Sequence, residues 1–183
     1  MAVKIEDQLL ILLIKSGNIK ALHLLINKHY KNIYSYCLRK IGNNETALDI
    51  TQDIFTKLLD NIDNYQFIGS FKNYLFTIAV NTCNDYYKKK KLVIVELDNT
   101  QVSDHGLSPV TVMEQKEQRN LIKCAIDNLP EEQKTVVILR FYHDMKLKDI
   151  AIVTKTPLPT VKSRLRQGIL KLRQLLKAGD LFE

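Results

Sequence analysis

The chain has 183 residues, which is enough for one ordinary domain or two small ones. A hydrophobic fraction of 45% allows a buried core, and the low content of glycine (6) and proline (4) argues against a fold of many short strands. The net charge of +7 suits a polyanionic partner such as nucleic acid, with a solvated basic surface as the simpler alternative.

Charge is distributed unevenly along the chain. Residues 1–91 carry 13 basic and 8 acidic side chains, residues 92–115 carry no basic and four acidic ones, and residues 116–183 carry 14 basic and 8 acidic ones. Two basic blocks separated by an acidic stretch indicate two modules for anionic partners. We therefore predict a domain at 1–91, a flexible acidic linker at 92–110 and a second domain at 111–183.

The sequence argues against several other protein classes. Three widely spaced cysteines without a CxxC pair indicate reduced thiols, as in a cytoplasmic protein. The apolar run at 9–14 is much shorter than the roughly 20 residues that span a bilayer, and no signal-peptide pattern surrounds it. The four histidines lack metal-ligand spacing and no glycine-rich phosphate loop exists, so we expect no metal, no cofactor, no small-molecule substrate and no catalysis.

The N-terminal half predicts four helices. The first covers about 6–16, the second 19–41, and the third begins near Asn44, a residue that favours helix starts. A polar loop at 61–70 precedes the fourth helix, which covers about 70–90 and ends in a lysine run whose charge suits a helix C-terminus. Apolar side chains at three- and four-residue steps give the later helices one buried face each.

The C-terminal half predicts four more helices, over about 111–128, 130–142, 147–154 and 159–176, so the expected fold class is all-α. The last two helices have the layout of a helix-turn-helix, in which a short helix meets a longer one across a tight turn. In the last helix Val161, Leu165, Ile169 and Leu172 share one face.

The remaining positions of that last helix carry side chains that suit the major groove of DNA. Arginine and lysine reach guanine or phosphate, glutamine pairs with adenine, and serine and threonine take either role. An ordinary amphipathic helix with a solvated basic face is the alternative. The candidate DNA-binding residues are Thr160, Lys162, Ser163, Arg164, Arg166 and Gln167.

The motifs Leu-Pro at 129–130, Leu-Lys-Asp-Ile-Ala at 147–151 and Thr-Val-Lys-Ser-Arg-Leu-Arg-Gln-Gly at 160–168 resemble the DNA-binding region of extracytoplasmic-function (ECF) sigma factors, the small two-domain members of the sigma-70 family. The family usually carries Glu where Asp149 stands and Gly where Pro159 stands. The first change is conservative, and the second shifts the helix start but not its register.

Two segments of the N-terminal half resemble the same family. Residues 47–55 are similar to the helix that grips the clamp helices of the largest polymerase subunit, and residues 71–85 are similar to the helix that melts and reads the −10 element. The family often has Trp near Tyr74 and Arg near Val80, so one phosphate or pairing contact is missing here. The two matches, in the right order, cover nearly the whole chain.

This resemblance implies a sigma factor that directs RNA polymerase core to promoters and reads the −35 element through the last helix. The implied partners are the clamp helices, the flap of the second-largest subunit, promoter DNA and an anti-sigma factor. The implied contacts with core polymerase are Asp49, Gln52, Asp53 and Phe55. The implied −10 contacts are Asn64, Tyr65, Phe67, Tyr74, Asn81, Asn84, Lys88 and Lys89.

Promoter melting requires that unpaired bases be held, and stacking on an aromatic ring contributes about 1–3 kcal/mol per base. Tyr65 and Phe67 lie in a polar loop and are the favoured candidates, whereas Phe71 and Tyr74 equally suit a core. A stand-alone helix-turn-helix regulator is the main alternative function, and an adaptor or anti-sigma protein is another. Copurification with polymerase core and promoter footprinting separate the three.

Overall fold

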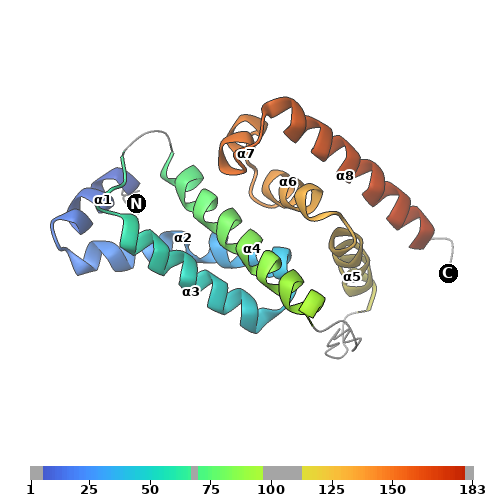
Figure 1. Ribbon diagram of the computed structural model, residues 1–183, viewed down its shortest axis with the longest axis horizontal. Coiled ribbons are helices and arrows are strands. Elements are labelled where there is room, and N and C mark those ends of the chain that lie inside the picture. The colour runs from blue at the N-terminus through green and yellow to red at the C-terminus, as the bar shows by residue number, and fades with distance from the viewer. Residues whose placement is uncertain (1–5, 67–69, 97–112, 180–183) are drawn as a thin grey trace.

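The computed structural model describes residues 6–66, 70–96 and 113–179, and these ranges form eight helices and no strand (Figure 1). The N-terminal half contains α1 Asp7–Lys15, α2 Ile19–Ile41, α3 Asn44–Asn61 and α4 Phe71–Glu96. The C-terminal half contains α5 Met113–Asp127, α6 Glu131–Phe141, α7 Leu147–Val153 and α8 Leu158–Gly179. The all-α prediction is confirmed.

Local sequence signals explain several of the helix ends. The side chain of Asn18 accepts a hydrogen bond from the backbone N–H of Ala21, and Asn43 does the same for Thr46, so each asparagine caps a helix start. Gly42 ends α2 in a left-handed conformation, with φ of 85°, that glycine adopts at little cost.

The main difference from the predicted elements lies at the end of α4. This helix extends to Glu96, so the first residues of the predicted linker are helical. Residues 97–110, the rest of that linker, lie outside the described residues.

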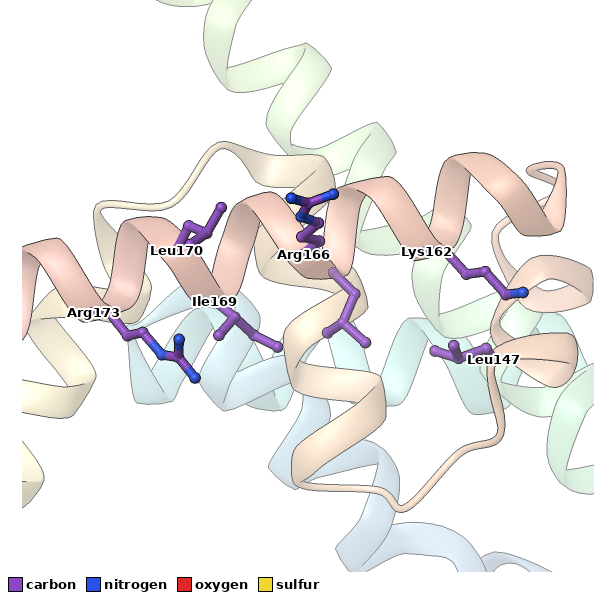
Figure 2. A pocket seen from close by; sticks show the side chains of 7 residues that line it. Leu147, Lys162, Arg166, Ile169, Leu170 and Arg173 are labelled. Carbon is purple, nitrogen blue, oxygen red and sulfur yellow. The ribbon is translucent and has the colours of Figure 1, made fainter.

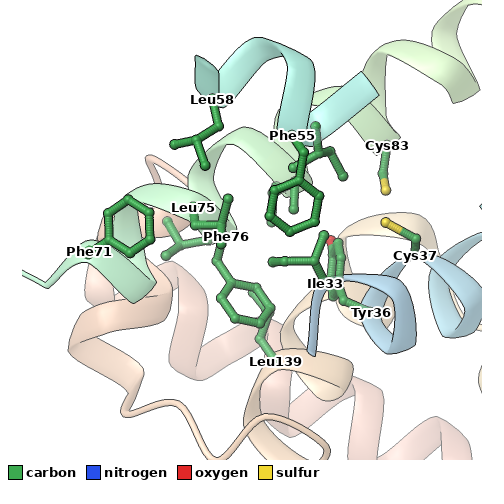
Figure 3. Packing of buried hydrophobic residues seen from close by; sticks show 14 of the residues in the cluster. Ile33, Tyr36, Cys37, Phe55, Leu58, Phe71, Leu75, Phe76, Cys83 and Leu139 are labelled. Atoms are coloured by element: carbon green, nitrogen blue, oxygen red, sulfur yellow. The ribbon is translucent and has the colours of Figure 1, made fainter. Parts of the chain in front are cut away.

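The core of the N-terminal half forms where α2, α3 and α4 pack together (Figure 3). The fully buried Tyr36 and Phe76 meet edge to face, with ring centroids 5.8 Å apart. Leu139 of α6 reaches the same cluster, and Figure 3 shows it below Phe76. The hydrophobic core is therefore continuous between the two halves of the chain.

The most extensive contacts between the two halves join α4 with α7 and α2 with α6. Figure 1 shows α4 beside the C-terminal helices, with part of α2 passing behind it. This arrangement brings the N-terminal part of α4 close to the helix-turn-helix formed by α7 and α8.

Gly168 lets α8 approach α6 closely. A Cβ atom at this position meets Cγ2 of Val137 at 2.9 Å, and the buried Val137 side chain has no solvent to move into. Alanine is the better helix former by about 1 kcal/mol, but overpacking a core costs about 1–3 kcal/mol. We expect Gly168→Ala to lower the free energy of unfolding by about 1 kcal/mol in urea titrations.

The exposed Ser163 on the same helix provides the control for this prediction. Ser163→Ala improves helix propensity without adding a contact, so its stability should stay equal or rise slightly. A Gly168→Ala protein as stable as Ser163→Ala would contradict the overpacking argument.

Candidate nucleic-acid interface

The helix-turn-helix is fixed by hydrogen bonds in its turn. The Thr154 hydroxyl donates to the Ile150 carbonyl at 2.7 Å, and the Thr156 N–H donates to the Ala151 carbonyl at 3.0 Å. Lys155 between them adopts a positive φ of 50°. Val161 is fully buried and anchors α8 against the rest of the domain. The helix α8 therefore has a defined angle to α7.

The polar side of α8 is accessible in the structure. Five of the six predicted −35 contacts are exposed and Arg164 is half-buried; the exposed ones are Thr160, Lys162, Ser163, Arg166 and Gln167. Ser163, Arg166 and Gln167 lie on the side of the helix opposite the buried Val161. The helix thus presents donors, acceptors and positive charge together, as a major-groove helix requires.

Two residues of α6 hold part of this face in place, and the sequence analysis missed both. Glu132 forms an ion pair with Arg164, whose guanidinium also donates to the Thr156 hydroxyl at 3.2 Å. The Gln133 amide donates to Oε1 of Gln167 at 3.2 Å. No local spacing predicts the contacts of Glu132 and Gln133, because each joins α6 to a residue more than thirty positions further along the chain.

A shallow groove runs beside the recognition helix, between α7 and α8 (Figure 2). Its volume is about 390 Å³, and Leu147, Leu165, Ile169 and Leu170 give it an apolar lining. Lys162, Arg166 and Arg173 add positive charge at its edges. Figure 2 shows Lys162 extended toward Leu147, on the flank of α8 rather than on its outermost side.

The predicted polymerase contacts on α3 divide into exposed and buried residues. Asp49, Gln52 and Asp53 are exposed and follow one another along the helix surface. Phe55, by contrast, is only 6% exposed, and its ring stacks on Tyr30 at 6.0 Å between centroids. Here the structure differs from the expectation: Phe55 supports the helix from within the core instead of offering its ring to a partner.

The aromatic residues before and within α4 also differ from the expectation of an open, polar loop. Tyr65 is only 6% exposed and packs against Tyr74 and Phe71, with ring centroids 4.7 and 5.7 Å away. Tyr74 is half-buried and Asn64 is exposed, whereas Phe67 lies outside the described residues. Polarity of the surrounding loop did not reveal that Tyr65 turns inward to this aromatic cluster.

The other predicted −10 contacts lie along α4. Asn81, Lys88 and Lys89 are exposed, and Asn84 is half-buried. Asn84 and Lys88 line a recess of about 560 Å³ that they share with Arg164 of the recognition helix. The structure thus places parts of the two predicted DNA-binding surfaces next to each other.

Two further kinds of feature are relevant in the described part of the chain, a metal site and a membrane-spanning helix. In residues 6–66, 70–96 and 113–179, no group of three or more His, Cys, Asp or Glu side chains is arranged to hold a metal ion. None of the helices over these same ranges combines the length and apolar character needed to cross a membrane.

Two family models match the chain. Sigma-70 region 2 matches residues 25–93, and Sigma-70, region 4 matches residues 119–172. The first match covers α3 and nearly all of α4, and the second covers the helix-turn-helix.

Several curated proteins are similar over most of their length. The ECF RNA polymerase sigma factor SigW of Bacillus subtilis is 29% identical, with 90% of this chain and 93% of the relative covered. RNA polymerase sigma factor SigV of the same organism is 31% identical, with 85% and 91% covered. The ECF RNA polymerase sigma-E factor of Escherichia coli K12 is 26% identical, with 90% and 91% covered.

Two solved structures share the fold. One is CnrH in complex with the cytosolic domain of CnrY, with a TM-score of 0.70, 21% identity, and 94% of this chain and 97% of that chain covered. The other is the sigma factor RpoE of Bartonella quintana in complex with the anti-sigma factor NepR, with a TM-score of 0.73, 20% identity, and 86% and 98% covered.

Proposed function

Because the chain belongs to the ECF sigma factors of the sigma-70 family, which direct RNA polymerase to promoters, we propose that α8 reads the −35 element, α4 holds the −10 element and α3 docks on the clamp helices of the largest polymerase subunit. The observation that carries this proposal is the exposed polar side of α8, set on a helix-turn-helix whose turn is fixed by hydrogen bonds.

At the −35 element, Ser163, Arg166 and Gln167 are the base readers, because they lie farthest from the buried side of α8. Arg and Gln make bidentate contacts with guanine and adenine in the major groove. Thr160, Lys162 and Arg164 lie on the flanks of the helix and contact phosphates, and Glu132 sets the position of Arg164.

At the −10 element, Asn81, Asn84, Lys88 and Lys89 of α4 hold the separated strand and its phosphates, and Asn64 of the preceding loop adds a polar group near the start of the helix. Tyr74 is the stacking platform, supported from behind by the buried ring of Tyr65 at 4.7 Å. For Phe67, which lies outside the described residues, the sequence context supports a base-capture role.

The clamp contact uses the acidic side of α3, where Asp49 and Asp53 lie one turn apart and exposed. Charge reversal should repel the basic partner that this side fits, so Asp49→Lys with Asp53→Lys is expected to weaken binding to polymerase core about tenfold, the effect of roughly 1.4 kcal/mol. Surface plasmon resonance with immobilised core measures it.

Asp60, also on α3 and exposed, provides the matched charge reversal. Asp60→Lys should leave core affinity within about twofold of the original protein, because it lies at the far end of the helix. Equal losses in the two proteins would point to a general effect of charge and contradict a specific acidic contact.

Transcription in vitro tests the function as a whole. Purified protein and polymerase core should together produce defined start sites on genomic fragments, and neither should do so alone. A protein that binds operator DNA well without core and does not copurify with it would instead be a stand-alone regulator. Other members of the fold are bound by anti-sigma proteins, as the NepR complex illustrates, and we propose such a partner and the polymerase flap as further ligands of this chain.

A further inference from the structure

A buried lysine joins the two halves of the chain. Lys40 at the end of α2 is 0% exposed, and its ammonium donates to the Glu131 carbonyl at 2.8 Å, to the Thr135 hydroxyl at 2.8 Å and to the Glu131 carboxylate. An ammonium has three donors, so these bonds satisfy it completely. Burial lowers the pKa of Lys40, and Glu131 offsets part of that effect. Lysine is almost never fully buried unless it is paired.

Further contacts cross the same boundary, near the start of α4 and next to Lys40. The Asn73 amide of α4 donates to the Asp149 carboxylate of α7 at 2.8 Å, and the Lys72 ammonium donates to the His143 carbonyl at 3.0 Å. The Arg39 guanidinium lies 4.2 Å from the centroid of the Tyr142 ring. Specific bonds at two separate places fix one relative orientation of the two halves.

That orientation is incompatible with binding both promoter elements. By their names the elements lie about 25 base pairs apart, which is about 85 Å of duplex at about 3.4 Å per base pair. A single recess of about 560 Å³ is lined by Asn84 and Lys88 of the −10 surface and by Arg164 of the −35 surface. The two surfaces are therefore much closer together than the two promoter elements are. The exposed side of α3, however, stays accessible in this arrangement.

We propose that the contacts of Lys40 with Glu131 and Thr135, here called the latch, hold the two halves of the free protein together. In this closed form the protein can dock on polymerase through α3, but it cannot span a promoter until the latch opens. This inference rests on the proposed function. Breaking the latch leaves Lys40 without its counter-charge, which favours separation of the halves and solvation of the ammonium. A closed population lowers the apparent affinity for any target that needs the open form.

The test compares Glu131→Gln with Asp127→Asn. Both replace a half-exposed acid that pairs with a buried lysine, but Asp127 pairs with Lys134 inside the C-terminal half, at 2.7 Å, and so does not cross the boundary. Small-angle X-ray scattering of the free proteins should show a larger radius of gyration for Glu131→Gln only. Asn73→Ala, which removes one of the boundary contacts near the start of α4, should act in the same direction as Glu131→Gln, and circular dichroism checks that the helices remain.

The functional measurement is a titration of each protein into polymerase core and promoter. Glu131→Gln should reach half-maximal transcription at about a tenfold lower concentration than the original protein, and Asp127→Asn should not. Unchanged scattering in Glu131→Gln and Asn73→Ala, or equal expansion in Asp127→Asn, would overturn the latch. Failure of the original protein to start transcription would instead overturn the proposed function, while the scattering result still decides whether the latch exists.

Discussion

Lowering the pH from 6.5 to 4 should remove about 3 kcal/mol of folding free energy through His143 alone. His143 is 6% exposed and lies between the two halves, with its ring 5.9 Å from that of Tyr36 and 4.9 Å from that of Phe76. Its Nε2 atom has no hydrogen-bond partner among the described residues. Such surroundings favour the neutral ring.

The pKa of His143 falls from 6.5 to about 4, first because burial penalises the charged form and then because Arg39 and Lys72 lie nearby. Asp144 opposes the shift only in part. Since the unfolded chain binds a proton below pH 6.5 and the folded chain does not until about pH 4, stability is complete above 6.5 and declines as the pH falls through this range.

Urea unfolding at several pH values between 7 and 4 measures this dependence. His143→Leu removes the titrating group, so its stability should change much less with pH, even if its stability at pH 7 is lower. The exposed His23 is the control, and His23→Gln should keep the original dependence. Identical slopes for His143→Leu and the original protein would show that other groups titrate there.

The elements of this fold follow from local signals in the sequence. Apolar residues at helical steps and the capping residues Asn18, Asn43 and Gly42 set the helices close to where they were expected. The exposed polar side of α8 was equally predictable, because the burial of Val161 fixes which side chains of this helix remain outside. The periodicity of apolar residues and helix capping both depend on residues a few positions apart, so a single sequence is enough to recognise them.

Burial that depends on distant residues was not predictable in the same way. A lysine at the end of α2 is ordinarily solvated and complements the helix dipole, yet Lys40 is buried because Glu131 and Thr135 of α6 surround its ammonium. Tyr65 was expected at the surface because its neighbours in the loop are polar, but Phe71 and Tyr74 provide an aromatic surface that covers it. In both cases the partner, rather than the local pattern, decides the environment.

Replacing Arg166 and Lys162 should separate reading of the −35 sequence from attachment to its backbone. Arg166 lies about 140° around α8 from the buried Val161, farther outward than Lys162 at about 100°, so Arg166→Ala should cost about 1–3 kcal/mol on the preferred −35 sequence and little on altered sequences. Lys162 lies on the flank toward Leu147, so Lys162→Ala should weaken all sequences equally and reduce the slope of log affinity against log salt by about 1. Holoenzyme binding to matched and altered promoters at several salt concentrations measures both effects.

Arg164 provides the comparison that tests the geometry behind this division. It carries the same charge as Arg166 but is held by Glu132 and Thr156 on the opposite flank of α8. Arg164→Lys keeps the charge and loses the planar fork, so binding should weaken less than in Arg166→Lys, where a bidentate base contact is lost. If Arg164→Lys relaxed sequence preference more than Arg166→Lys, the flank of α8 beside α6 would face the bases, and the helix would have to enter the groove rotated toward that side.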